Sequence, residues 1–162
     1  MNRALNFSDE RRVYAARVME RRQTMFAIAY AILRNPHDAM DAVQDAILQG
    51  WLKRGALRDE TRFAAWMTRI LVNTCKNALR RRRPTAELFD ISDAPGHSED
   101  ALDIRAAMAR LDVKLRICAT LFYYEDMSLR DIAATLGLSQ GTVKSRLHRA
   151  RARLRSDLEV RD

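Results

Sequence analysis

The stretch SLRDIAATLGLSQGTVKSRLHRARARL, residues 128–154, decides the fold of the C-terminal part of this 162-residue chain. Ser128 and Asp131 have the spacing of a capping box with Asp in place of Glu, which predicts the start of a helix. Gly137 permits the left-handed turn that ends a helix, and Ser139 can cap the next one. Two helices joined by such a turn predict a helix-turn-helix.

The second of these helices has two distinct faces. Its apolar residues recur at spacings of 4, 3 and 4 and predict the packing face: Val143, Leu147, Ala150 and Leu154. Another side, here called the reading face, carries Lys144, Ser145, His148 and Arg149. The N-terminal part of the second helix of a helix-turn-helix enters the major groove, where Lys and Arg donate hydrogen bonds to guanine and Ser donates or accepts them.

The other basic residues of this helix are placed to contact phosphates rather than bases: Arg146, Arg151, Arg153 and Arg155. Such contacts add salt-dependent affinity without sequence information. The alternative is a basic amphipathic helix whose charges are simply solvated. The capping residues and the turn glycine before the helix favour DNA recognition over that alternative.

The whole composition favours an all-α fold and a polyanionic partner. The chain is 48% hydrophobic, has only 5 Gly and 3 Pro, and lacks alternating Val/Ile/Thr-rich runs. A net charge of +8 makes nucleic acid the first partner to consider, ahead of a membrane surface.

The charge is distributed in three segments. Residues 1–83 hold 17 basic and 8 acidic side chains, residues 84–100 hold 0 and 5, and residues 101–162 hold 12 and 8. The middle segment also contains two of the three prolines, which is typical of a linker. We therefore expect two small helical domains, 1–83 and 101–162, joined by an acidic linker, 84–100.

The N-terminal block is predicted to form three helices, over 9–34, 36–55 and 61–82. Asn35 can cap the second, Pro36 suits its first turn, and Gly55 can end it in a left-handed conformation. The expected buried residues are Met19, Phe26, Tyr30 and Leu33; Met40, Val43, Ile47 and Trp51; and Phe63, Trp66, Met67, Ile70 and Leu71.

The C-terminal block is predicted to have two more helices before the helix-turn-helix, near 101–110 and 113–124. Their expected buried residues are Leu102, Ile104, Met108 and Leu111 in the first, and Leu115, Cys118, Leu121 and Phe122 in the second. Cys75 and Cys118 stand 43 positions apart without a CxxC motif. We expect both to be reduced and packed, with no metal site and no cofactor.

Two classes of protein are disfavoured. The first residues form no apolar signal region and no run of 18 apolar residues occurs, so we expect no membrane insertion and a cytoplasmic protein. An enzyme is also disfavoured, because three scattered histidines and two distant cysteines supply no nucleophile–base pair, metal cluster or phosphate loop.

Three segments in this order resemble the extracytoplasmic-function (group IV) sigma factors of bacterial RNA polymerase, within the sigma-70 family. DAVQDAILQGW (41–51) resembles their core-binding segment, FAAWMTRILVNTCKNALRRRRP (63–84) their promoter-melting helix, and residues 128–154 their C-terminal helix-turn-helix. The resemblance covers nearly the whole chain. It implies a non-enzymatic specificity subunit that binds core polymerase and a bipartite promoter.

The resemblance also implies roles for individual residues. Those expected to bind the clamp coiled coil of the polymerase β′ subunit are Asp41, Gln44 and Asp45. Those expected at the minus-10 element, within or near the segment 57–63, are Asp59, Thr61, Arg62, Asn73, Asn77 and Arg80. Those expected at the minus-35 element are Thr142, Lys144, Ser145, Arg146, His148 and Arg149. The polymerase β flap and an anti-sigma factor are further expected partners.

Plainer interpretations exist for several of these residues. The acidic face at 41–45 and the pair Asn73 and Asn77 are also compatible with solvated helix surface, and Phe63 and Trp66 are expected in the core rather than stacked on bases. A stand-alone helix-turn-helix regulator that binds duplex DNA as a dimer is the alternative function. A helical adaptor with incidental charge is the third hypothesis.

Overall fold

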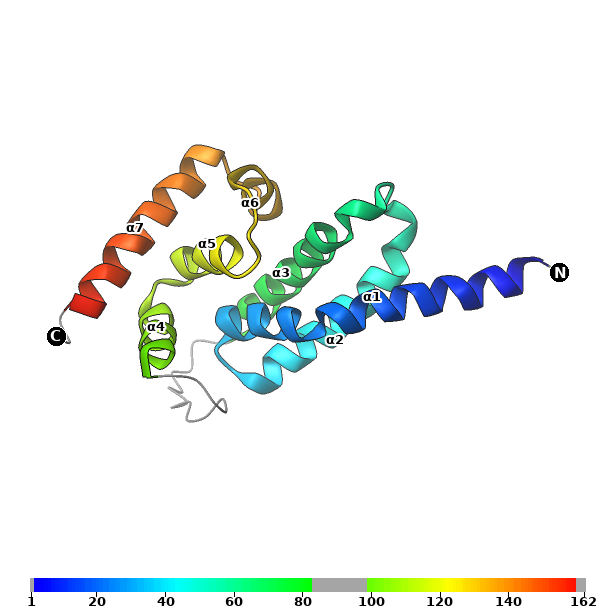
Figure 1. Ribbon diagram of the computed structural model, residues 1–162, viewed down its shortest axis with the longest axis horizontal. Helices are drawn as coiled ribbons and strands as arrows, with labels where there is room; N and C mark the ends of the chain where they lie inside the picture. Colours follow the sequence, from blue (N-terminus) through cyan, green and yellow to red (C-terminus); the bar gives the residue numbers. More distant parts are fainter. Residues whose placement is uncertain (1, 83–98, 160–162) are drawn as a thin grey trace.

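The protein is described by a computed structural model that covers residues 2–82 and 99–159. These residues form helices and connecting turns and contain no strand, which confirms the all-α prediction (Figure 1). The helices are α1 (Asn2–Leu33), α2 (Pro36–Lys53), α3 (Phe63–Arg81), α4 (Glu99–Arg110), α5 (Val113–Tyr123), α6 (Leu129–Leu136) and α7 (Gln140–Glu159), with 3-10 turns η1 (Arg54–Ala56) and η2 (Glu60–Arg62). Most of the predicted linker lies outside the described residues, and its last two positions, 99 and 100, already belong to α4.

Helix α1 is longer at its N-terminus than predicted, because it begins at Asn2 rather than near residue 9. Contacts to the end of α2 and the turn after it hold this extension: the Phe7 ring meets Trp51 edge-on at 5.5 Å, and the Arg54 guanidinium lies over the Phe7 ring at 5.7 Å. Aromatic and cation–π contacts of this kind add to burial of apolar area.

The sequence predicted the N-terminal end of α2 correctly but not its C-terminal end. Asn35 accepts a hydrogen bond from the Asp38 N–H at 3.0 Å and Pro36 occupies the first turn, as expected. The left-handed end predicted at Gly55 is wrong. The helix instead tightens into η1, whose last turn closes with a bond from the Leu57 N–H to the Arg54 carbonyl, and this geometry needs no positive φ.

The buried faces of α1 and α2 are shifted relative to the prediction. Met19 and Met40 were expected in the core but are 63% and 40% exposed. The face of α1 that packs inside carries Val18, Met25, Ile28, Ala29, Ile32 and Leu33, and that of α2 carries Ala39, Ala42, Val43, Ala46 and Gly50. Small residues dominate on the buried face of α2 because α1 and α2 approach closely there. A Cβ on Gly50, for example, would lie 2.4 Å from the hydroxyl of Tyr14 in α1.

The C-terminal block packs α4, α5 and α6 against α7. Asp112 caps α5 by accepting a hydrogen bond from the Lys114 N–H, and Met108, Leu111, Leu115, Ala119 and Ala150 form a buried cluster. Ile104 was expected in this core but is 50% exposed, since the side of α4 that meets α7 carries Ala107, Met108 and Leu111 instead. The Leu102 side chain lies outside the described part. Cys75 and Cys118 are free and buried, which confirms the prediction for both.

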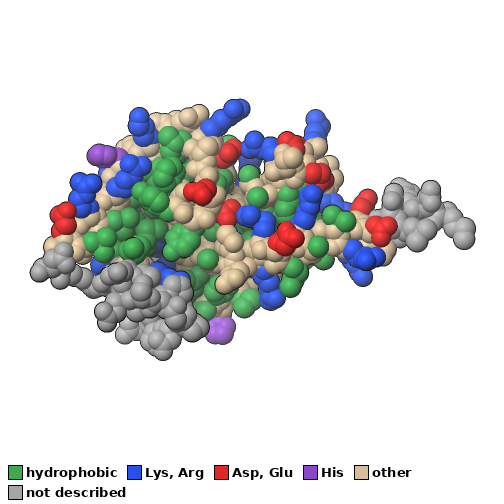
Figure 2. All heavy atoms as spheres, viewed as in Figure 1, with side chains coloured by type: hydrophobic (Ala, Val, Ile, Leu, Met, Phe, Trp, Pro, Cys, Tyr) green, Lys and Arg blue, Asp and Glu red, His purple; other side chains and the backbone are tan. Residues whose placement is uncertain are grey.

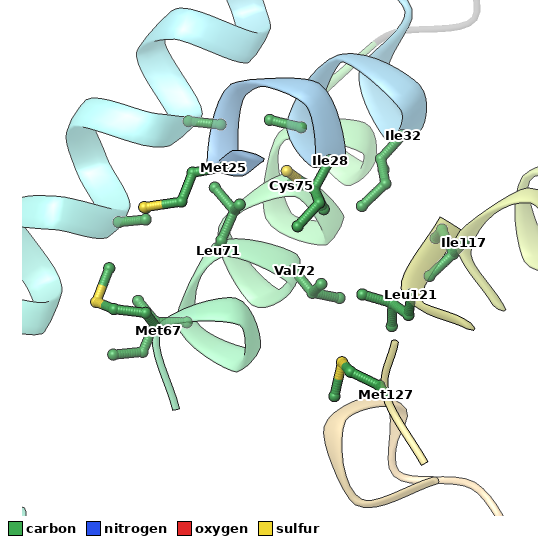
Figure 3. Close-up of a cluster of buried hydrophobic side chains, with 14 of the residues drawn as sticks. Met25, Ile28, Ile32, Met67, Leu71, Val72, Cys75, Ile117, Leu121 and Met127 are labelled. Carbon is green, nitrogen blue, oxygen red and sulfur yellow. The ribbon is translucent and has the colours of Figure 1, made fainter. Parts of the chain in front are cut away.

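The two blocks share one hydrophobic core. Helix α5 packs against α1, and α6 packs against α3. A single cluster of buried residues therefore runs from the N-terminal bundle into α5, α6 and α7, and Figure 3 shows Val72 of α3 and Leu121 of α5 directed toward one another, with Met127 beside them. In this arrangement the N-terminal and C-terminal helices form one packed body.

Leu71 gives a direct test of this core. It is fully buried, so Leu71→Ala removes apolar contacts and leaves a cavity, and we expect the free energy of unfolding to fall by about 2–5 kcal/mol. Leu52→Ala is the matched control because Leu52 is 71% exposed, and it should change stability by less than about 0.5 kcal/mol. Urea denaturation followed by circular dichroism measures both. Equal losses in the two variants would contradict this packing.

Candidate nucleic-acid and polymerase interfaces

The helix-turn-helix has the geometry predicted for it. The Ser128 hydroxyl accepts from the Asp131 N–H at 3.1 Å and donates to the Asp131 carboxylate at 2.9 Å, so Ser128 caps the start of α6. Gly137 has φ of 66° and ends α6 in the left-handed region. Ser139 accepts from the Thr142 N–H at 3.1 Å at the start of α7. These local bonds fix the angle at which α7 leaves α6.

The reading face of α7 is free for a ligand in this arrangement. Lys144, Ser145, His148 and Arg149 are all exposed, while Val143, Leu147 and Ala150 on the opposite side are buried. Figure 2 shows Lys and Arg side chains projecting along the outer edge of α7. The face can therefore approach a DNA groove without moving a neighbouring helix.

Two residues predicted with the reading face do not lie on it. Thr142 is half-buried and its hydroxyl lies 2.9 Å from that of Ser139, so it takes part in the helix cap. Arg146 is half-buried beside Cys118 of α5. Burial raises the pKa of the Cys118 thiol, and the neighbouring Arg146 opposes that shift. Both residues thus help to hold the helix-turn-helix together.

Helix α3 presents a polar stripe, defined here as Arg69, Asn73, Asn77 and Arg80. All four side chains are exposed and recur every three or four positions, so they lie on one side of the helix. The structure thus brings together three of the residues predicted for the minus-10 element and adds Arg69. Phe63 is buried, as expected of a core residue, whereas Trp66 is half-buried and lies on the side of α3 that carries the polar stripe.

The segment between α2 and α3 holds the other predicted minus-10 residues. Asp59 accepts hydrogen bonds from the N–H and the hydroxyl of Thr61, at 3.0 and 2.6 Å, and these bonds lower the pKa of the Asp59 carboxyl. Arg62 points toward the C-terminal block, where its guanidinium lies 2.8 Å from the Asp131 carboxylate. Asp59 and Thr61 therefore shape the loop, whereas Arg62 is an exposed cation with an internal partner.

The predicted polymerase-binding residues lie on one side of α2. Asp41, Gln44 and Asp45 are all exposed. The same side continues to Leu48 and Leu52, which are 58% and 71% exposed. This side of α2 therefore combines two carboxylates, an amide and two exposed leucines. Gln44, Asp45, Leu48 and Leu52 follow Asp41 by 3, 4, 7 and 11 positions. This helical spacing is the signal in the sequence that could have identified the two leucines.

Polar contacts also join the two blocks. Glu125, whose side chain is 7% exposed, accepts hydrogen bonds from Arg21 of α1 at 2.7 Å and from Thr68 of α3 at 2.8 Å. Arg116 of α5 is buried and donates to the carbonyl of Ile32 at 3.3 Å, near the end of α1. Burial lowers the pKa of Arg116. Nothing in the sequence pattern indicated these contacts, because their partners are far apart in the chain.

The described residues show neither a metal site nor a membrane span. No group of three or more His, Cys, Asp or Glu side chains there is placed to hold a metal ion. None of the described helices is both long and apolar enough to cross a bilayer.

Comparison with known proteins identifies the family. Residues 17–85 match the family model of sigma-70 region 2, and residues 101–154 match that of sigma-70 region 4. The RNA polymerase sigma-E factor of Streptomyces antibioticus is 34% identical over 151 residues, which cover 90% of this chain and 84% of that protein. The chain therefore belongs to the sigma-70 family of RNA polymerase sigma factors, in its extracytoplasmic-function group.

Further relatives agree with this assignment. The ECF RNA polymerase sigma factor SigM of Mycobacterium tuberculosis is 40% identical over 126 residues, covering 75% of this chain but 64% of SigM. The match thus spans less than two thirds of that relative. Among solved structures, the sigma factor RpoE of Bartonella quintana in complex with the anti-sigma factor NepR has a TM-score of 0.75 at 28% identity, covering 96% of this chain and 98% of that one. CnrH in complex with the cytosolic domain of CnrY has a TM-score of 0.70 at 26% identity, with 94% and 91% covered.

The contact between Arg62 and Asp131 predicts a measurable titration. The hydrogen bond from Arg62 is the main cause, and that from Ser128 the next, of a lowered pKa at Asp131 in the folded protein. The charged carboxylate therefore stabilises the fold at pH values above 3.8, the ordinary pKa of this group. This stabilisation is lost as the pH falls through the lower pKa of the folded state. In Arg62→Gln the pKa of Asp131 should rise toward 3.8. Carboxyl NMR titration measures it. Asp59 is the internal control because Thr61 is the main cause of its lowered pKa, and a rise at Asp59 with none at Asp131 would contradict the contact.

Proposed function

We propose that this chain is a promoter-specificity subunit that binds core RNA polymerase, recognises a bipartite promoter and helps to melt its minus-10 region. The observation that carries the proposal is that one chain presents two separate DNA-facing surfaces, the reading face of α7 and the polar stripe of α3. Each surface lies in the part of the chain that matches one of the two sigma-70 region models. The subunit acts by binding, and not as an enzyme, in the cytoplasm where the polymerase transcribes.

The N-terminal block, residues 1–83, takes the minus-10 role. Amide side chains both donate and accept hydrogen bonds, so Asn73 and Asn77 suit the exposed edges of bases that have left the stack. Arg69 and Arg80 on the same stripe supply charge for the phosphates of the strand. Asp59 and Thr61 take part by shaping the loop before α3, and Arg62 contacts the strand directly.

The C-terminal block, residues 101–162, takes the minus-35 role. Lys144, Ser145, His148 and Arg149 are placed to meet base edges in the major groove, and Arg146 and Thr142 support the helix that carries them. The segment 84–100 joins the blocks and is proposed to pass through the polymerase. The β flap is proposed as a contact of this block.

The acidic side of α2 is proposed to bind the clamp coiled coil of β′. Asp41, Gln44 and Asp45 supply charge and hydrogen bonds, and Leu48 and Leu52 supply apolar contact. The neighbouring structures are sigma factors in complexes with NepR and with CnrY, which supports an anti-sigma factor as a further partner of this chain. A stand-alone regulator would use the helix-turn-helix but would leave the exposed faces of α2 and α3 without a role.

Run-off transcription tests the proposal. Purified core polymerase with this chain and a set of bipartite promoters should give promoter-dependent transcripts, and the chain should co-elute with core. Core alone is the control. Neither transcript nor co-elution would overturn the proposed function.

Charge reversal on α2 should separate the two binding activities. The double variant Asp41→Lys, Asp45→Lys replaces two exposed carboxylates and should weaken core binding at least tenfold, because like charge replaces complementary charge at the interface. Duplex binding by α7 should be unchanged in a gel-shift assay. The control is Glu20→Lys, an exposed acid of α1. Equal loss of both activities would indicate misfolding and not an interface.

Two arginines of α7 should behave differently. Arg149→Ala removes a side chain of the reading face, and we expect binding to the preferred duplex to fall by about 1–3 kcal/mol with relaxed preference at one base pair. Arg153→Ala removes an exposed cation outside that face and should weaken all duplexes alike, with the salt slope reduced by about one. Fluorescence anisotropy over a salt series on permuted duplexes distinguishes the two results. Equal effects on all base pairs in both variants would refute this division of roles.

A further inference from the structure

The segment that joins α2 to α3, residues 54–62 and here called the loop, is held by little buried surface. It consists of the two 3-10 turns η1 and η2 with three extended residues between them. None of its side chains is buried, and only Arg54 and Leu57 are half-buried. Local stability is low where few apolar contacts are buried, so individual polar contacts decide which conformation such a loop adopts.

A pocket lies between the loop and α1. Its volume is about 710 Å³. Helix α1 lines it with Val13, Tyr14 and Arg17, and the loop lines it with Leu57 and Glu60. Because this space is open, the loop is not packed along α1 here and reaches the helix through a few side-chain contacts.

One of these contacts comes from the middle of α1. The Arg17 guanidinium forms an ion pair with the Glu60 carboxylate and lies over the Phe63 ring at 5.2 Å. Glu60 is the first residue of η2, and its carbonyl accepts a hydrogen bond from the Phe63 N–H at the start of α3. Arg17 therefore contacts the loop at the point where it continues into α3.

A second set of contacts holds the other end of the loop. Arg54, the first residue of η1, lies over the Trp51 ring at 3.9 Å and over the Phe7 ring at 5.7 Å. Its guanidinium is also 3.5 Å from the Glu10 carboxylate. Phe7 and Glu10 both belong to the N-terminal part of α1, which extends beyond the rest of the helical bundle (Figure 1). The same helix thus contacts both ends of the loop.

The residues expected at the minus-10 element lie next to Glu60. Asp59 accepts hydrogen bonds from the N–H and the hydroxyl of Thr61, and the Arg62 N–H donates to the Asp59 carbonyl at 3.0 Å. These bonds join residues 59–62 into one turn. A displacement of Glu60 therefore displaces its three neighbours together.

We propose that Arg17 and Glu10 of α1 are positioning residues for minus-10 recognition, which hold the loop in the one conformation that discriminates between bases. Arg17 fixes the end at η2, and Glu10 fixes the end at η1 through Arg54. The inference rests on the proposed function for the identity of the DNA element. A loop with a single conformation presents one set of groups to the bases, whereas a loop that rearranges accommodates more than one base.

The contact at η2 is suited to a positioning role because it contributes little to the stability of the whole fold. The side chains of Arg17 and Glu60 are 35% and 67% exposed, and exposed ion pairs are weak. Loss of this pair should therefore change base preference without unfolding the chain.

Run-off transcription with core polymerase tests the contact at η2. The templates carry every base at each minus-10 position of a promoter that the wild-type chain uses, with the minus-35 element fixed. Arg17→Glu places two carboxylates together, so the ratio of transcripts between the preferred and the least preferred base should fall at least fivefold. Glu60→Arg places two guanidinium groups together and should have the same effect. The double variant Arg17→Glu, Glu60→Arg restores an ion pair and should return the ratio to within twofold of wild type.

Controls separate a positioning role from direct DNA binding. Arg11→Glu changes the net charge equally at an exposed position of α1 and should leave the ratio within twofold. Base preference at the minus-35 element should be unchanged in all variants. If Arg17 instead bound a DNA phosphate, Arg17→Glu would weaken transcription from all templates alike and the double variant would restore nothing, which would overturn the inference.

Hydrogen exchange of the free chain, followed by NMR, measures the loop directly. The N–H groups of Leu57 and Arg62 each donate to a carbonyl within the loop, so their exchange reports its opening. Arg17→Glu should raise exchange of the Arg62 N–H at least tenfold, and Glu10→Lys should do the same at Leu57. Glu10→Lys should also lower the transcript ratio as Arg17→Glu does. Exchange of the Leu71 N–H in α3 should be unchanged, which verifies that both variants are folded.

The outcomes distinguish this inference from the proposed function. Wild-type transcription, with base preference and loop exchange unchanged in Arg17→Glu and Glu10→Lys, would overturn the positioning role and leave the function supported. Faster loop exchange with unchanged base preference would overturn it as well, since the loop would be held without any effect on recognition. No transcription from the wild-type chain would overturn the function, and the exchange measurements would then still decide whether α1 holds the loop.

Discussion

Helix α3 has three sides with three different neighbours, and the arrangement of the whole molecule depends on this division. Met67 and Leu71 pack into the N-terminal bundle, whereas Thr68 and Val72 meet the C-terminal block. The polar stripe is left for solvent or a ligand. If the C-terminal block moved away from α3, the buried side chains of Thr68 and Val72 would be exposed together with the carboxylate of Glu125. The helix assigned to promoter melting is thus also the one that joins the blocks.

The two kinds of contact between the blocks have different physical consequences. Apolar packing around Val72 and Leu121 favours association of the two blocks. This contribution depends on the apolar area removed from water and not on the direction of individual contacts. The hydrogen bonds at Glu125 and Arg116 fix one arrangement, because a buried charge left without its partner is costly. Such an interface is stable in one geometry and loses several contacts together when it opens. That behaviour is compatible with the proposed function, in which the chain meets both a polymerase and two separate DNA elements.

Local bonds set the parts of the site that the sequence could predict. The cap at Ser128, the left-handed Gly137, the cap at Ser139 and the cap at Asn35 each involve residues within four positions of one another. Such bonds depend on neighbours in the chain, so their sequence pattern predicted these four positions, although the same pattern failed at Gly55. The caps set where α7 begins, and its apolar residues Val143, Leu147 and Ala150 must face the core. The opposite side of α7 is therefore exposed.

The remaining features depended on tertiary structure. The sequence by itself determined an all-α chain, a helix-turn-helix and the polar faces of α2, α3 and α7, because periodicity and caps are local. Only the tertiary structure decided that Met19 and Met40 lie outside the core, that Arg146 lies against Cys118 of α5, and that Arg62 meets Asp131. The reason is that α1 and α3 each contact more than one neighbour, so which side is buried depends on partners far away in the chain, such as Glu125 for Arg21 and Asp131 for Arg62, which are 104 and 69 positions away.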